Sequence, residues 1–255
     1  MAPAPAAPAA RIDTARFRAL LFDLDGVITQ SMHLHARAWK RLFDAFLERH
    51  AAATGEPFVP FDVAADYRPY VDGKPRYLGV RSFLESRGID LPEGDPADGP
   101  DRQTVCGLGN RKDLYFQEEL HTRGVDIYRS SVDFIRAARQ RGLKTAVVSS
   151  SRNCRQVLDV VGIADLFDTI VDGVAAEEGD LAGKPAPDTF LEAARHLGVT
   201  PERAVVFEDA ISGVQAGAEG GFGLVVGVDR LGHPDDLRLN GAHVVVADLA
   251  ELTLA

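Results

Sequence analysis

The sequence predicts an α/β fold in which a doubly wound parallel sheet carries an inserted helical domain. Short apolar runs alternate with amphipathic segments through the second half of the chain, as in sheets built from βαβ units. Acidic or hydroxyl side chains directly follow several of these runs. About 120 residues separate the first run from the second, far more than one βαβ crossover needs. We therefore expect a Rossmann-like core that is interrupted by an insertion.

The expected core elements follow one another in a regular order. The first strand is the apolar run that ends at Phe22. Further strands are expected at residues 144–149, 169–171, 203–207, 223–228 and 243–246. Helices are expected at residues 152–161, 187–197 and 210–219. This alternation predicts a parallel sheet formed by residues 16–30 and 123–255.

The insertion, residues 31–122, is predicted to be a mostly helical cap. Apolar residues recur at helical spacing between residues 34 and 50, including Leu34, Ala38, Leu42 and Phe46. Two segments rich in Gly, Pro and acids, residues 54–60 and 92–100, are expected to be surface loops of this cap. Residues 1–15, which begin with an Ala- and Pro-rich stretch, are expected to form a disordered arm.

Composition excludes several classes of function. The formal net charge of −10 argues against a nucleic-acid partner, because binding to the phosphate backbone relies on clustered basic residues. No apolar run approaches the roughly 20 residues that span a bilayer. The two cysteines, Cys106 and Cys154, suggest neither a disulfide framework nor a zinc site. We expect a monomeric cytoplasmic protein without a membrane partner, whose partner is a small molecule.

Two carboxylates stand where the first strand ends. Side chains two residues apart on an extended chain point the same way, so Asp23 and Asp25 converge on one point. A hard cation such as Mg²⁺ would stabilise this pair, and a carboxylate beside metal and phosphate can attack phosphorus to form an aspartyl-phosphate. The alternative is an acidic surface turn, because Asp-x-Asp-Gly also suits a tight turn.

Three later segments supply the other groups that phosphoryl transfer needs. Ser149 closes the second apolar run, Lys184 precedes a proline, and Glu208 with Asp209 ends a third run. A hydroxyl and a helix N-terminus can hold a phosphoryl group, and an ammonium can neutralise its charge. Each segment also has a structural alternative: a serine helix cap, a surface lysine, or acids at a helix start.

The order Asp-x-Asp, Ser, Lys, Glu-Asp resembles the haloacid dehalogenase-like phosphotransferases. The resemblance implies that Asp23 is the nucleophile and Asp25 the general acid and base. It implies that Ser149 holds the transferring phosphoryl group and that Lys184 offsets its charge. The implied cofactor is Mg²⁺, held by Asp23, Asp25, Glu208 and Asp209, with Asp25 binding through its backbone carbonyl.

Within this superfamily, residues 19–252 most resemble the β-phosphoglucomutase family. The resemblance rests on the double-Asp strand, on a histidine in the first cap helix, and on the segment Val71-Asp72-Gly73-Lys74-Pro75-Arg76. The implied substrate-binding residues are His35, Gly73, Arg76, Lys112, Ser151 and Asn153. The sequence departs from the family at Asp72, where the pattern often has lysine, and Lys112 or Lys74 is expected to supply the missing charge.

A mutase must hold a second phosphate that does not react. Arg76 is expected to form that contact, helped by Ser151 and Asn153, because a guanidinium binds phosphate through two parallel hydrogen bonds. His35 is expected to contact Asp25 and to control when the acid acts; the alternative is a histidine packed in the apolar stripe of its helix.

The resemblance thus implies interconversion of β-D-glucose 1-phosphate and glucose 6-phosphate. The reaction would pass through an aspartyl-phosphate and β-glucose 1,6-bisphosphate, which acts as intermediate and activator. Two alternatives stay open. A Mg²⁺-dependent sugar-phosphate phosphatase would have the same core but transfer the phosphoryl group to water, and a non-catalytic protein would keep only the fold.

Overall fold

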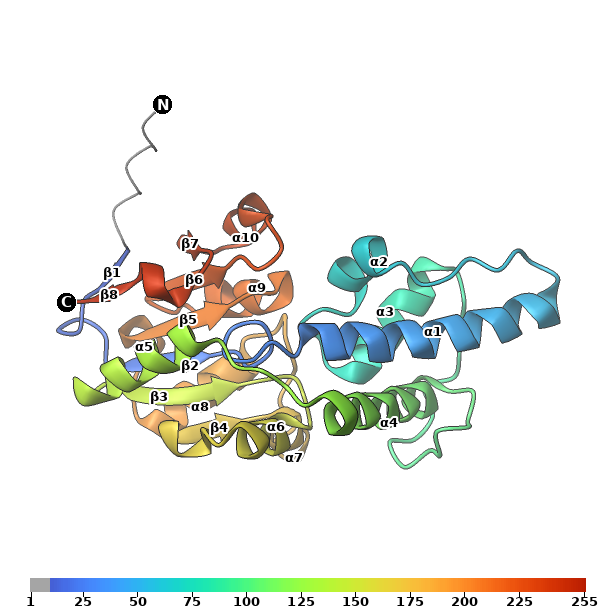
Figure 1. Cartoon of the computed structure of the whole chain (residues 1–255), viewed down its shortest axis with the longest axis horizontal. Coiled ribbons are helices and arrows are strands. Elements are labelled where there is room, and N and C mark those ends of the chain that lie inside the picture. Colours follow the sequence, from blue (N-terminus) through green and yellow to red (C-terminus); the bar gives the residue numbers. More distant parts are fainter. Residues whose placement is uncertain (1–9) are drawn as a thin grey trace. The chain divides into compact units, whose positions relative to one another are not determined.

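The computed structural model describes residues 10–255, which divide into two compact units (Figure 1). The core contains residues 10–29 and Ile127–Ala255, and the cap is Gln30–Asp126. The cap therefore extends four residues beyond the predicted boundary at residue 122. The entering and leaving segments are paired: Thr29 forms a β-bridge with Ile127, and the Gln30 N–H donates to the Asp126 carbonyl.

One parallel sheet forms the centre of the core, which confirms the predicted fold class. Its strand order is β4-β3-β2-β5-β6-β7. The strands are β2 (Ala19–Phe22), β3 (Lys144–Val148), β4 (Thr169–Val171), β5 (Ala204–Glu208), β6 (Leu224–Val228) and β7 (Val244–Val246). The strand order reverses at β2, which lies between β3 and β5. Ligands of open α/β sheets bind outside the carboxyl ends of the strands at such a point.

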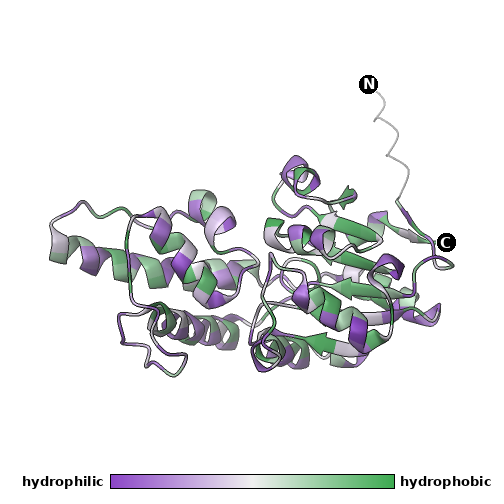
Figure 2. Ribbon diagram, turned by 180° about the vertical axis from the view of Figure 1, so that it is seen from behind, coloured by the Kyte–Doolittle hydropathy of each residue, from purple (hydrophilic) through white to green (hydrophobic). Residues whose placement is uncertain are grey.

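Both faces of the sheet are apolar because both are covered by helices. Side chains alternate along each strand, so Leu21, Val148 and Val206 share one face with residues of α8 and α9. Phe22 and Phe207 lie on the other face, where their rings stack at 4.4 Å and Phe134 of α5 meets Phe207 edge-on. Figure 2 shows the strands of this sheet as largely hydrophobic.

The core helices fall close to their predicted positions. Those predicted are α6 (Cys154–Val161), α8 (Asp188–Leu197) and α9 (Ile211–Glu219), each starting one or two residues later than expected. The others are α5 (Arg129–Gln140), α7 (Gly173–Glu178) and α10 (Pro234–Leu239). Single 3₁₀ turns lie at η1 (Ala164–Leu166), η2 (Pro201–Arg203) and η3 (Leu249–Glu251).

The two chain ends pair with each other in the core. Strand β1 (Arg11–Ile12) runs parallel to β8 (Thr253–Leu254), and the Thr14 N–H donates to the Ala255 carbonyl. The prediction of a disordered arm over residues 1–15 is therefore wrong for residues 11 and 12, whose backbone groups bond to the C-terminal strand. It is also wrong for residues 10 and 13–15: the Ala10 carbonyl accepts from the Thr253 N–H, and the Asp13 side chain accepts from the Ala15 N–H. Residues 1–9 lie outside the described residues.

The cap consists of helices around an aromatic core. The helices are α1 (Met32–Thr54), α2 (Val63–Tyr70), α3 (Arg76–Ser86) and α4 (Val105–Arg123). The predicted stripe of α1 is buried, and Trp39 and Phe43 pack there with Phe61 and Phe83. Helix α1 ends at Gly55, whose φ of +78° closes the last turn at little steric cost.

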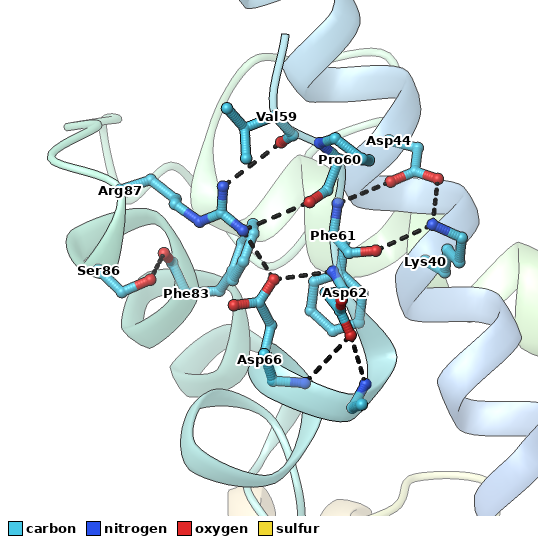
Figure 3. Close-up of polar contacts among 12 residues, drawn as sticks. Lys40, Asp44, Val59, Pro60, Phe61, Asp62, Asp66, Phe83, Ser86 and Arg87 are labelled. Carbon is cyan, nitrogen blue, oxygen red and sulfur yellow. Dashed lines mark hydrogen bonds and ion pairs between the residues drawn. The ribbon is translucent and has the colours of Figure 1, made fainter.

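The loop between α1 and α2, expected at the surface, is held by a polar network (Figure 3). Asp44 accepts from the Phe61 N–H at 2.8 Å, and Lys40 donates to the Phe61 carbonyl at 2.9 Å. Arg87 pairs with Asp66 at 2.7 Å and reaches the Val59 carbonyl. The loop backbone is therefore anchored to α1, α2 and α3. Within the part of the chain described, no helix is long and apolar enough to cross a membrane.

Candidate active site

The site is built around Asp23, the first residue after β2. Its N–H donates to the Phe207 carbonyl at 2.9 Å, which extends the pairing of β2 with β5 by one step. Its Oδ1 atom lies 2.6 Å from Lys184 Nζ. The side chain is 8% exposed, so the nucleophile predicted from the sequence is held at the strand end by backbone and ammonium together.

Lys184 is the buried cation of the core. Its Nζ atom contacts Asp23 Oδ1 and Glu208 Oε1, each at 2.6 Å, and the Val148 carbonyl at 2.9 Å. These contacts use all three donors of an ammonium group, and the side chain is only 1% exposed. The alternative of a surface lysine before a proline is therefore wrong.

The charges of this cluster shift two pKa values. Burial raises the pKa of Asp23 well above its usual range; Lys184 opposes this, while Glu208 and Asp25 add to it. Burial lowers the pKa of Lys184, but the attraction of Asp23 and Glu208 outweighs burial and leaves that pKa above its ordinary value. The ammonium of Lys184 is thus charged at neutral pH. The acidic groups around it outnumber this one positive charge.

Glu208 has a role that the sequence analysis did not predict. One carboxylate oxygen contacts Lys184, and the other accepts from the Ala210 N–H at 2.8 Å, just before α9. A Cβ atom at Gly213 would fall 1.7 Å from Glu208 Oε1, so that helix position requires glycine. Glu208 was expected as a metal ligand, but both of its oxygens contact protein groups. The sequence signal for such pairing is a glutamate that directly continues an apolar run, where a charged side chain needs a partner.

Asp25 lies in a tight loop after β2 and is half-buried. The Gly26 N–H donates to the Thr29 carbonyl at 2.8 Å, and the Thr29 N–H donates to the Leu24 carbonyl at 2.9 Å. Gly26 has a φ of +88°, a backbone conformation that a side chain would strain. The loop therefore fixes the backbone around Asp25, two residues beyond Asp23.

The serines after β3 form a turn that leads into α6. The Ser149 N–H donates to the Val171 carbonyl at 3.0 Å, and Ser149 Oγ accepts from the Ser151 N–H at 3.1 Å. Ser151 Oγ accepts in turn from the Asn153 N–H at 3.2 Å. Both hydroxyls thus stabilise the turn, but neither serine caps α6, whose N-cap residue is Asn153, so the alternative of a serine helix cap is wrong. A hydroxyl that accepts still has its own hydrogen to donate, so this does not exclude a phosphate contact.

In the cap, His35 of α1 and Lys112 of α4 contact each other. Lys112 Nζ lies 2.7 Å from His35 Nδ1 and about 5 Å from the ring centroids of Trp39 (5.1 Å) and Phe116 (5.0 Å). His35 stacks on Phe116 at 4.2 Å. A charged lysine only donates, so His35 Nδ1 accepts and Nε2 carries the ring hydrogen. Two predicted site residues are thereby brought together, and His35 also packs as its alternative expects.

Arg76 starts α3 and faces α4. Its Nη1 atom lies 3.3 Å from Asp113 Oδ1, and its Nη2 atom lies 3.2 Å from the Tyr77 hydroxyl. Gly73, with a φ of +67°, lies in the turn before this helix. Lys74, one alternative source of positive charge, donates to the Pro69 carbonyl and to Ser82 Oγ, so it stabilises that turn. Lys112, buried beside His35, is the better candidate.

The predicted site residues therefore form two groups, one in each unit. In the core, Asp23, Lys184 and Glu208 are in direct contact. Asp209 follows Glu208 directly, and Asp25 is close enough to Asp23 to raise its pKa. In the cap, His35 contacts Lys112, and Arg76 contacts Asp113, the next residue of α4.

The donor set of the core has the chemistry that Mg²⁺ prefers. Asp23, Asp25, Glu208 and Asp209 offer oxygen ligands after neighbouring strands, and a hard divalent cation binds such ligands. Their four carboxylates exceed the single charge of Lys184. Among residues 10–255, however, no three His, Cys, Asp or Glu side chains are arranged as a metal cluster. The residues fit such an ion by charge and ligand type.

Comparison with known proteins identifies the family. A sequence model described as a haloacid dehalogenase-like hydrolase matches residues 17–221. The chain belongs to the haloacid dehalogenase-like hydrolases. The resemblance predicted from the sequence motifs is thus confirmed, and the protein is an enzyme of this family.

Several relatives of this family member carry the name beta-phosphoglucomutase. The Mycobacterium bovis protein of that name is 53% identical over 240 residues, which cover 93% of this chain and 92% of the relative. The Bacillus subtilis protein of the same name is 30% identical over 237 residues, again 93% and 92% of the two chains.

Two solved structures of the family share the fold. The beta-phosphoglucomutase of Clostridium difficile superposes with a TM-score of 0.71 at 26% identity, covering 93% of each chain. A CbbY mutant from Rhodobacter sphaeroides, solved in complex with xylulose-(1,5)bisphosphate, gives 0.69 at 25% identity, covering 93% of this chain and 97% of that one.

Proposed function

We propose that this enzyme is a β-phosphoglucomutase, which interconverts β-D-glucose 1-phosphate and glucose 6-phosphate. The single observation that carries the chemistry is the contact between Asp23, a buried carboxylate at the switch point, and Lys184. The choice of a mutase is supported by the relative of that name at 53% identity over nearly the whole chain. The contact between the cap residues His35 and Lys112 also supports the choice of a mutase.

In the first half-reaction, a carboxylate oxygen of Asp23 attacks the phosphorus of the bisphosphate. The bond from phosphorus to the sugar oxygen breaks, and Asp25 gives its proton to that oxygen. Asp23 becomes an aspartyl-phosphate, and Asp25 becomes a carboxylate. Lys184, with its ammonium against Asp23, offsets the negative charge that gathers on the phosphoryl oxygens. Ser149 and the backbone amides of the following turn hold the same oxygens.

In the second half-reaction, a hydroxyl of the sugar monophosphate receives the phosphoryl group. Asp25, now a carboxylate, takes the proton of that hydroxyl as it attacks the phosphorus of the aspartyl-phosphate. Asp23 is regenerated as a carboxylate. The product is again the 1,6-bisphosphate, which acts as both intermediate and activator.

Mg²⁺ is the proposed cofactor. It would be held by Asp23, the backbone carbonyl of Asp25 and Asp209, with Glu208 as the adjacent acid. When bound, the ion supplies charge that neutralises phosphoryl oxygens beside the nucleophile. Lys184 alone cannot balance the carboxylates of Asp23, Glu208 and Asp209, so a chelator is expected to abolish turnover and added Mg²⁺ to restore it.

The cap is proposed to bind the part of the sugar phosphate that does not react. Arg76 would take the second phosphate through its guanidinium, releasing Asp113, and Ser151, Asn153 and the Gly73 backbone would assist. Lys112 would supply the charge that Asp72 does not. His35, whose Nε2 atom carries the hydrogen, would contact Asp25 and control its access to the leaving oxygen.

The experiment that tests the proposal supplies β-D-glucose 1-phosphate with a trace of β-glucose 1,6-bisphosphate. A mutase yields glucose 6-phosphate with little free phosphate, because the phosphoryl group passes from Asp23 to a sugar hydroxyl. Dominant release of inorganic phosphate would instead establish the alternative, a sugar-phosphate phosphatase. That alternative is supported by the core alone, because Asp23, Asp25 and Lys184 serve transfer to water equally well.

A further inference from the structure

Two side chains hold backbone carbonyls of the loop that carries Asp25. Ser131 Oγ donates to the Val27 carbonyl at 2.6 Å, and Arg230 Nε donates to the Gly26 carbonyl at 2.8 Å. Gly26 is the residue directly after Asp25. Ser131 belongs to α5, and Arg230 follows β6, so two segments distant in sequence hold carbonyls of this one loop.

Arg230 is itself tightly constrained. Its side chain is 10% exposed, and its Nη1 atom donates to the Ala247 carbonyl at 2.7 Å and lies 3.3 Å from Asp248 Oδ2. Its guanidinium lies 3.6 Å from the centroid of the Tyr128 ring. The Tyr128 N–H donates to the Ile28 carbonyl, so this ring belongs to a residue bonded to the same loop.

The anchor for Arg230 is a rigid turn near the C-terminus. Asp248 accepts from the Ala250 N–H at 2.8 Å, and Glu251 closes a capping box with it at the start of η3. A planar guanidinium can bridge two fixed acceptors because its donors stand in a rigid fork, which a flexible lysine does not provide. The Gly26 carbonyl is thereby tied to η3 through one side chain.

Arg230 Nη2 is buried and has no hydrogen-bond partner among residues 10–255. A buried hydrogen-bond donor without an acceptor lowers the free energy of unfolding. The donors of an exposed arginine avoid this cost because they bond to water. The contact with Gly26 is made by Nε, so the guanidinium joins the residue directly after Asp25 to the turn at Ala247 and Asp248.

We propose that Arg230 is a positioning residue that holds the carboxyl of Asp25 in place for proton transfer, by fixing the carbonyl of Gly26. The inference rests on the proposed function, in which Asp25 protonates the sugar oxygen as the bond to phosphorus breaks. Sub-ångström placement of such a group matters, because a shift of about 1 Å can cost about 10²-fold in rate. Arg230 touches neither substrate nor phosphorus in this scheme.

This role predicts a dependence on the leaving group. When Asp23 is phosphorylated by β-glucose 1,6-bisphosphate, the departing sugar oxygen needs a proton from Asp25. When it is phosphorylated by acetyl phosphate, the departing acetate is stable as an anion and needs none. Displacement of Asp25 therefore slows the first reaction and spares the second, whereas general damage to the site slows both.

The test measures single-turnover phosphorylation of Asp23 in the full chain with each phosphoryl donor. Arg230→Gln is expected to slow the reaction with the bisphosphate by about 10²-fold and to change that with acetyl phosphate little. Equal losses with both donors, or no loss with either, would overturn the inference. Arg238→Gln is the matched control, since Arg238 is an exposed arginine of α10 that pairs with Asp235, and both rates should stay at the wild-type level.

Two further variants keep the outcome decisive. Asp25→Asn must itself show the leaving-group dependence; if it loses both rates equally, the proposed acid role of Asp25 is wrong, whatever Arg230 does. If Asp25→Asn shows the dependence and the Arg230 variants do not, only the inference fails. If Arg230→Gln folds poorly, Arg230→Ala is measured instead, with and without added guanidinium ion. The ion is expected to restore the rate with the bisphosphate and to leave the rate with acetyl phosphate unchanged.

Discussion

Each unit of this enzyme buries one lysine of the site, and the surroundings of the two lysines differ. In the core, Lys184 contacts the carboxylates of Asp23 and Glu208 and a backbone carbonyl, all within 2.9 Å. In the cap, Lys112 contacts the imidazole of His35 and lies over the rings of Trp39 and Phe116. The first cation contacts two opposite charges, and the second contacts an imidazole nitrogen and aromatic faces.

The two lysines therefore differ in how firmly their surroundings hold them. Two buried carboxylates hold a buried ammonium strongly, so Lys184 is a fixed part of the charge balance around Asp23. Contacts with aromatic faces are weaker, on the order of 0.5–2 kcal/mol. A cation with such neighbours can turn toward an incoming phosphate at a lower cost in free energy.

The largest expected effect comes from Lys184→Met, which removes the core cation. Breaking a buried ion pair leaves uncompensated carboxylates, so the free energy of unfolding should fall by about 3–5 kcal/mol and turnover should be lost. Chemical denaturation and the mutase assay measure the two effects. Lys144→Met is the control: this exposed lysine at the start of β3 donates one hydrogen bond to Leu197, worth about 0.5–1.5 kcal/mol. Equal losses in the two variants would contradict the comparison.

The next effect is expected for Arg76→Ala in the cap. Charge-assisted hydrogen bonds to the second phosphate are worth about 1.5–3 kcal/mol, so mutase turnover should fall about tenfold to a hundredfold. Phosphorylation of Asp23 by acetyl phosphate, which has no second phosphate, should change little. Arg81→Ala on the same helix, where Arg81 pairs with Glu93 at the surface, should leave both reactions unchanged. If both reactions suffer equally, Arg76 is not the second phosphate contact.

Lys112→Met tests the comparison between the cap lysine and the core lysine directly. Methionine is close to lysine in volume and packs well against aromatic rings, so the free energy of unfolding should fall by less than in Lys184→Met. Loss of a charged contact to the substrate should raise KM about tenfold. Denaturation and steady-state kinetics on the two lysine variants, measured side by side, give the result. A loss of stability as large as that of Lys184→Met would show that the cap lysine is held as firmly as the core one.

The smallest expected effect concerns an ion pair at the edge of the core. Burial raises the pKa of Asp168, but the Thr145 N–H and Arg139 outweigh it and hold that pKa below its usual range. The folded pKa is therefore depressed, so the contribution to stability is present above the unfolded pKa of about 3.9 and is lost as pH falls through the folded value. Asp168→Asn should cost about 0.2–1 kcal/mol at neutral pH and nothing at strongly acidic pH. Denaturation at both pH values tests this, and a loss independent of pH would point to packing instead.

Sequence patterns predicted helices and strands best where a single hydrophobic periodicity dominates. The apolar runs placed β4 at its observed bounds and the other sheet strands within one residue, because buried parallel strands must be apolar on both faces. The helical stripe of α1 placed its buried face, although the helix extends four residues past the predicted end at His50. The pairing of residues 11 and 12 with the C-terminal strand was missed, since two-residue strands leave no periodic signal.

The sequence by itself determined which groups stand at the strand ends: two acids after β2, a serine after β3 and a Glu-Asp pair at β5. Strand periodicity and the order of the motifs are local properties, so they can be read along the chain. Tertiary structure alone decided which groups meet. It set Lys184 between Asp23 and Glu208, Lys112 against His35, and Arg230 against Gly26, residues separated by 24 to 204 positions. Such contacts depend on how strands order and helices pack, which no local pattern specifies.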